Sequence, residues 1–89
     1  MKVIKIGAIW CNGCLVMKPR WAELEKENPW LKTEFYDYDE HPEIVEKYQV
    51  NENLPVAIVL DDNDKELKRF SGEVEKDELL KTLKALLSA

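Results

Sequence analysis

Hydrophobic and polar positions divide the chain into seven segments of two kinds. Short apolar runs that are typical of strands cover residues 3–9, 33–39, 55–60 and 67–70. Longer runs in which apolar residues recur at helical spacing cover residues 14–27, 43–48 and 79–87. The predicted order of elements is therefore β-α-β-α-β-β-α, an α/β arrangement.

The connections between these segments predict how the strands pair. A helix joins the first two strands, so they should lie parallel. A short polar turn at residues 61–64 joins the last two, so they should form an antiparallel hairpin. One mixed four-stranded sheet flanked by helices accommodates this order. A length of 89 residues suits a single domain, residues 1–89.

Composition and charge exclude some classes of binding partner. The chain is 45% hydrophobic and 35% charged, which is ordinary for a globular protein. Its 13 basic and 18 acidic residues give a formal net charge of -5. With no basic run, neither a nucleic acid nor an anionic membrane is expected as a partner. No apolar run approaches the roughly 20 residues that span a bilayer, and the N-terminus is unlike a signal peptide. We therefore expect a cytoplasmic protein, and we expect it to be a monomer.

The two cysteines carry the most specific chemistry in the sequence. Cys11 and Cys14 are three positions apart, so a bridge between them would constrain the unfolded chain little. They follow a predicted strand and begin a helix, where unpaired backbone N–H groups and the helix dipole favour a thiolate at Cys11. We expect Cys14 to be more buried and to stay protonated until it is needed. The pattern indicates a reversible dithiol, in which Cys11 attacks a partner disulfide and Cys14 releases the product.

A zinc site is an alternative use of the same cysteines. A structural zinc site needs about four ligands. Beyond the two cysteines the chain offers one histidine, His41, which precedes Pro42 in a predicted helix-entry turn. We therefore expect no metal. We expect no other cofactor either, because the sequence has no Gly-rich phosphate loop and the dithiol itself would hold the redox equivalents.

The residues around the cysteines resemble the thioredoxin family. Residues 10–14, Trp-Cys-Asn-Gly-Cys, with Lys18-Pro19 following, look like the start of the family's active-site helix. The resemblance continues through residues 41–50, 54–56 and 69–79, and so covers nearly the whole chain. The strand and helix that precede the active-site strand in longer thioredoxins have no counterpart. The resemblance therefore implies a minimal thioredoxin-like fold.

This resemblance implies a role for individual residues. Cys11 would be the nucleophile, Cys14 the resolving thiol, and Pro55 would follow a cis peptide bond and lie against the dithiol. The implied substrate-binding residues are Trp10, Asn12, Gly13, Leu54, Pro55 and Gly72. The implied activity is that of a thiol–disulfide oxidoreductase. Such an enzyme would reduce disulfide-containing protein substrates and be re-reduced by a donor of the thioredoxin reductase type.

Three residues at two sites depart from the family pattern. Asn12-Gly13 stands where thioredoxins usually have Gly-Pro, which leaves the redox potential open. Lys5 stands where the family usually has a buried aspartate that is thought to help deprotonate the resolving thiol. A buried lysine needs a partner or a route to water. Two arrangements follow: a pair between Lys5 and Asp37 of the neighbouring strand that tunes the thiols, or a Lys5 that reaches solvent at the sheet edge.

Two other functions share parts of this pattern. A glutaredoxin that uses glutathione would have the same chemistry, although Trp10 and the thioredoxin-like C-terminal part argue against it. Ser71-Gly72 followed by Glu73 is a weak match to the glutaredoxin glycine pair. A non-catalytic binding module with this fold would not need the second cysteine. Reduction of insulin with dithiothreitol, and of a mixed disulfide with glutathione, would separate the three.

Overall fold

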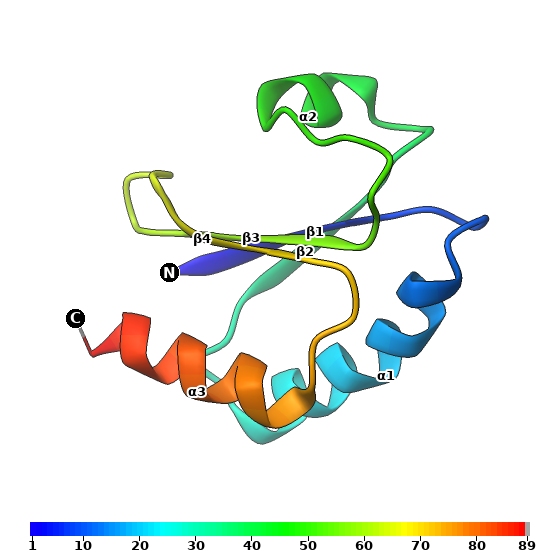
Figure 1. The fold of residues 1–89 in the computed structure, drawn as a ribbon. Coiled ribbons are helices and arrows are strands. Elements are labelled where there is room, and N and C mark those ends of the chain that lie inside the picture. Colours follow the sequence, from blue (N-terminus) through cyan, green and yellow to red (C-terminus); the bar gives the residue numbers. More distant parts are fainter. Residues whose placement is uncertain (89) are drawn as a thin grey trace.

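The chain folds into one β-sheet that is covered on both faces by helices (Figure 1). The computed structural model describes residues 1–88. Its elements, in chain order, are β1 (Lys2–Gly7), α1 (Asn12–Glu27), β2 (Thr33–Asp37), α2 (Pro42–Lys47), β3 (Val56–Leu60), β4 (Glu66–Ser71) and α3 (Lys76–Leu87). This is the order that the sequence predicts.

The strands lie in the order β2-β1-β3-β4. β1 is parallel to β2, which follows it after helix α1, and antiparallel to β3. β3 and β4 form the antiparallel hairpin that their short connection predicts. The mixed four-stranded sheet is therefore confirmed. All five residues of the central strand β3 are buried, because helices cover both faces of the sheet.

Two hydrophobic cores lie on opposite faces of the sheet. Helices α1 and α3 cover one face, and α2 covers the other (Figure 1). Val3 of β1 belongs to the core against α1 and α3, and its neighbour Ile4 belongs to the core against α2. Because side chains alternate along a strand, Lys5 and Gly7 lie on the same face as Val3. The face that carries α1 is the one that holds the cysteines.

Helix α1 begins two residues earlier than the apolar pattern predicts, because a cysteine side chain caps it. Cys11 has an extended backbone (φ -97°, ψ 109°), and its Sγ accepts a hydrogen bond from the N–H of Cys14 at 3.1 Å. At the other end, Asn28 is the C-cap, and its side-chain amide donates to the carbonyl of Leu24 at 3.0 Å. Pro29 follows at once. One cysteine of the pair therefore also fixes the start of the helix.

Candidate active site

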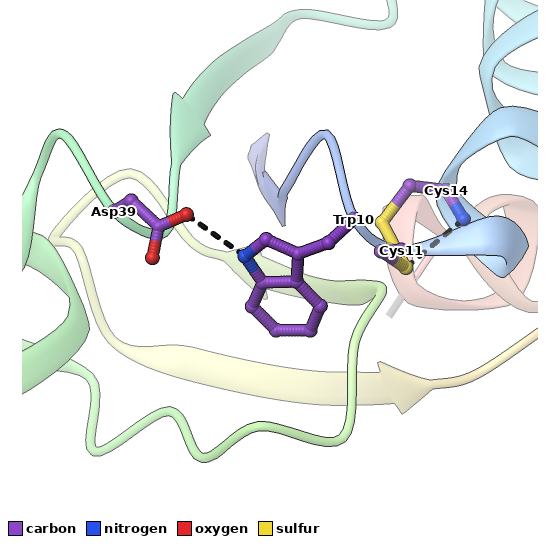
Figure 2. Close-up of a disulfide and its surroundings, with 4 residues drawn as sticks. All are labelled: Trp10, Cys11, Cys14 and Asp39. Carbon is purple, nitrogen blue, oxygen red and sulfur yellow. Dashed lines mark hydrogen bonds between the residues drawn. A yellow bond between two sulfur atoms is a disulfide. The ribbon is translucent and has the colours of Figure 1, made fainter.

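Cys11 and Cys14 form a disulfide at the N-terminus of α1, after the loop that leaves β1 (Figure 2). Their Cα atoms are 5.3 Å apart, within the range that a disulfide spans. The first turn of α1 contains no acidic residue that would oppose a thiolate. The predicted position of the pair, after a strand and at a helix start, is confirmed. Negative charge on Cys11 is favoured there by the helix dipole and by the N–H of Cys14.

The relative burial of the two cysteines is the reverse of the prediction. Cys11 is 6% exposed, whereas Cys14 is partly exposed. Cys11 is held in the tight turn between β1 and α1, where its N–H donates to the carbonyl of Ala8 at 3.1 Å. Cys14 lines a cavity between α1 and the sheet. The prediction of a more buried Cys14 was wrong because this cavity leaves the second cysteine accessible.

Four of the predicted substrate-binding residues meet beside the dithiol. The Leu54–Pro55 peptide bond is cis, as predicted. A Cβ placed on Gly13 would lie 3.0 Å from Cδ of Pro55 and 3.9 Å from the carbonyl oxygen of Leu54. The N–H of Gly72 donates to the carbonyl of Pro55 at 2.8 Å. The structure therefore brings Gly13, Leu54, Pro55 and Gly72 together, while their role in substrate binding stays a prediction.

Trp10 lies beside the disulfide and is held by two side chains that follow β2 (Figure 2). Its indole Nε1 donates to Oδ2 of Asp39 at 2.8 Å, and its ring meets that of Tyr38 edge to face with centroids 5.9 Å apart. The neighbouring Asn12 is exposed. Sequence reasoning missed Asp39. The signal was present, because β1 and β2 are parallel and their C-terminal ends lie at one edge of the sheet.

Gly7, at the end of β1, is a second residue that sequence reasoning missed. A Cβ placed on Gly7 would lie 2.9 Å from Sγ of Cys14 and 3.3 Å from Cε1 of Phe35. Both distances are shorter than ordinary van der Waals contact, so no larger residue fits without movement of its neighbours. Gly7 therefore makes room for the second cysteine of the pair.

Comparison with known proteins matches almost the full chain to one family. The family model described as Thioredoxin matches residues 1–85. This chain belongs to the thioredoxin family. Thioredoxin H5 of Oryza sativa subsp. japonica is 36% identical over 73 residues, which are 82% of this chain and 53% of that protein. Thioredoxin C-3 of Corynebacterium nephridii is 30% identical over 77 residues, 86% of this chain and 52% of that protein. This family member spans about half the length of both relatives.

Solved thioredoxin structures share the fold of this family member. Thioredoxin 1 from the thermophilic eubacterium Thermosipho africanus TCF52B superposes with a TM-score of 0.85 at 26% identity, covering 99% of this chain and 96% of that one. The thioredoxin of Fasciola hepatica gives a TM-score of 0.84 at 31% identity, covering 94% and 78% of the two chains. The predicted thioredoxin-like fold is therefore confirmed.

Of the two arrangements considered for Lys5, the pair with Asp37 does not form. Nζ of Lys5 lies 3.6 Å from Oε1 of Glu25 on α1, and the Lys5 side chain is 20% exposed. Oδ2 of Asp37 accepts hydrogen bonds from the N–H groups of Asp39 and Glu40 at 2.9 and 3.1 Å, so this carboxylate caps the turn after β2. The register explains the difference, because Lys5 is paired across the strands with residue 35 and Asp37 with residue 7. A role for Lys5 and Asp37 in tuning the thiols stays a prediction.

The remaining candidate ligand, His41, is engaged elsewhere. Its Nδ1 lies 3.0 Å from Oε2 of Glu43, and this contact lowers the pKa of Glu43. Within residues 1–88, no group of three or more His, Cys, Asp or Glu side chains is placed to hold a metal ion. Over the same residues, no helix has the length and apolar character that a membrane span requires.

Proposed function

We propose that this chain is a thiol–disulfide oxidoreductase that reduces protein disulfides. One observation supports it most strongly: Cys11 and Cys14 form a disulfide at a helix N-terminus, against a cis-proline, in a chain of the thioredoxin family. A disulfide in this position closes a very short loop and contributes little as a structural staple. Such a disulfide is well suited to reversible reduction and oxidation.

The reaction would use the dithiol form in two steps. The Cys11 thiolate attacks one sulfur of the substrate disulfide, so a mixed disulfide forms and the other substrate sulfur leaves as a thiolate that takes up a proton. Cys14 then attacks Sγ of Cys11, and its proton balances the one taken up by the second substrate sulfur, which leaves as a thiol. The Cys11–Cys14 disulfide forms, and its two electrons have passed to the substrate. The N–H of Cys14, which donates to Sγ of Cys11, would stabilise the attacking thiolate.

The surface around the dithiol suits an extended protein segment. Pro55 presents no N–H next to the sulfurs. The Leu54 N–H donates to the carbonyl of Glu52 at 2.9 Å, so it is the Leu54 carbonyl that would pair with a substrate strand. Trp10 and Asn12 are exposed at the rim. The partners we propose are disulfide-containing proteins and an electron donor of the thioredoxin reductase type. We further propose that the protein acts as a monomer in cytoplasmic electron transport.

Reduction of insulin with dithiothreitol as electron source tests this function. Wild-type protein should accelerate the reduction, and Cys11→Ser should abolish the acceleration because the attacking sulfur is lost. Cys14→Ser should instead accumulate stable mixed disulfides on Cys11, which gel electrophoresis without reductant detects. Both variants remove one sulfur from the same helix turn, so each is the control for the other.

Three results would contradict the proposal. No acceleration by the wild type would exclude general thioredoxin activity. Equal trapping by Cys11→Ser would reverse the roles of the two cysteines. Activity with glutathione and a mixed-disulfide substrate, without activity on insulin, would instead favour a glutaredoxin.

A further inference from the structure

A cavity of about 510 Å³ lies between α1 and the sheet, and Cys14 forms part of its wall. This volume falls within the roughly 300–1,000 Å³ that is typical of small-molecule sites. The cavity reaches from Phe35 and Asp37 on β2 to Phe70 on β4. Pro55 and Gly72 line it where it meets the site described above, and it extends beyond them to Trp21 of α1 and to β2.

Small residues on the sheet keep this cavity open. Gly7 of β1 and Ala57 of β3 line it where larger side chains would fill it. Its walls include the aromatic rings of Trp21, Phe35 and Phe70. A planar aromatic molecule could therefore contact rings on several sides.

The rim of the cavity exposes an unusual amount of apolar surface. Ile9, Leu15 and Phe35 all line the cavity, and they are 92%, 67% and 60% exposed. Large apolar side chains that gather around one concave site mark a binding surface more often than scattered ones do. This rim gives an apolar ligand a way in.

The charges on the cavity wall favour an anion. Lys5 and Lys18 line the cavity, and Asp37 is the one acidic residue among its lining residues in the described chain. The Asp37 carboxylate already accepts two backbone N–H groups. Nζ of Lys5 lies 3.6 Å from Oε1 of Glu25, an oxygen that also accepts a hydrogen bond from Thr33, and 6.0 Å from the centroid of the Trp21 ring. At these distances the ammonium keeps donors for a further acceptor.

We propose that this cavity binds a small aromatic carboxylate, with its rings against Trp21 and Phe35 and its carboxylate against Lys5. The bound molecule covers the part of Cys14 that lines the cavity. Occupancy therefore slows reactions at the Cys14 thiol and leaves the rate of reactions at the Cys11 thiol unchanged. The proposal goes beyond disulfide reduction and does not depend on it.

Titration of the wild-type disulfide form with 2-naphthoate, followed by amide NMR, tests the site directly. We expect saturable binding of one molecule, with the largest shift changes at the amides of Gly7, Leu15 and Phe35. No saturation in the millimolar range, or shift changes centred away from these residues, would overturn the proposal. Insulin reduction is a separate measurement, so loss of the ligand site and loss of the proposed activity can be told apart.

A charge variant tests the anion contact. Lys5→Met should weaken naphthoate binding by about tenfold, because a charge-assisted hydrogen bond is lost. The matched control is Lys2→Met, which removes the same charge from the opposite face of the same strand. The uncharged analogue 2-naphthalenemethanol should bind both variants equally. Equal naphthoate affinity in Lys5→Met and Lys2→Met would contradict the role of Lys5.

Variants of the cavity wall, and protection of the thiols from alkylation, test where the ligand binds. Ala57→Leu should abolish binding while circular dichroism shows that the fold is kept, and Phe35→Ala, at an exposed position, should weaken it. Naphthoate should slow alkylation of Cys14 by iodoacetamide in Cys11→Ser, and should leave alkylation of Cys11 unchanged in Cys14→Ser. Unchanged binding in both cavity variants, or equal protection of the two thiols, would place the ligand elsewhere and refute the proposal.

Discussion

At the scale of single residues, the surroundings of the dithiol depend on two positions without a side chain. A Cβ on Gly7 would press on Sγ of Cys14, and a Cβ on Gly13 would lie 3.0 Å from Cδ of Pro55. Gly72 differs from both, because it has a positive φ of 79° and open space around its Cα. The first two glycines are needed for space and the third for its backbone conformation.

Gly7→Ala should displace the second cysteine. The added methyl group forces Sγ of Cys14 or the ring of Phe35 to move, and such overpacking costs about 1–3 kcal/mol in the free energy of unfolding. In a Cys11→Ser background, the rate of Cys14 alkylation should also change, which mass spectrometry measures. Gly72→Ala is the control, because it costs stability through backbone strain and should leave this rate unchanged. An unaltered Cys14 rate in Gly7→Ala would contradict the contact.

At the scale of elements, Arg69 joins β4 to the turn that ends α2. Its Nη2 donates to the carbonyl of Tyr48 at 2.7 Å, and its Nε and Nη2 donate to the two carboxylate oxygens of Glu66 at 3.1 and 2.8 Å. This bidentate contact lowers the pKa of Glu66 below its ordinary value. The loop that leads to Pro55 follows Tyr48, so Arg69 supports that loop from the hairpin.

Glu66→Gln should make the protein less sensitive to acid. A folded-state pKa below the unfolded value of 4.5 means that Glu66 stabilises the fold above that pH, and that this contribution is lost as pH falls through the lowered folded value. Urea unfolding between about pH 6 and about pH 3 should therefore show a smaller loss for Glu66→Gln than for wild type. The difference should stay below about 1 kcal/mol, because Glu66 is 43% exposed. An acid dependence of Glu66→Gln identical to that of wild type would contradict the prediction.

The elements could be predicted from local sequence, whereas several contacts of the site could not. Pro42 at a helix start and the polar turn between β3 and β4 are local signals, and both were interpreted correctly. The partner of Lys5 depends on strand register and on how α1 lies over the sheet. Neither can be inferred from a short segment of the sequence. The open cavity behind Cys14 likewise arises from residues on five elements or their adjoining loops, so the burial of the two cysteines was predicted in the wrong order.

At the scale of the whole molecule, strand β3 belongs to both hydrophobic cores. Ile58 packs in the core against α2, and its neighbour Val59 packs in the core against α1 and α3. Both side chains are fully buried. Because one central strand carries both cores, loss of packing on one face should weaken the other face as well, and the described chain should unfold as one cooperative unit.

Ile58→Ala tests this coupling. The variant leaves a cavity in the core against α2, at a cost of about 2–5 kcal/mol, which is a large part of the roughly 5–15 kcal/mol that stabilises a small domain. In a Trp10→Phe background, the remaining tryptophans Trp21 and Trp30 pack in the opposite core and report on it by fluorescence. Fluorescence and circular dichroism should give one urea midpoint, lowered equally by Ile58→Ala. The control Leu87→Ala, at an exposed position, should shift that midpoint little. A fluorescence midpoint that stays at its wild-type value while the circular dichroism midpoint falls would show that the two cores unfold independently.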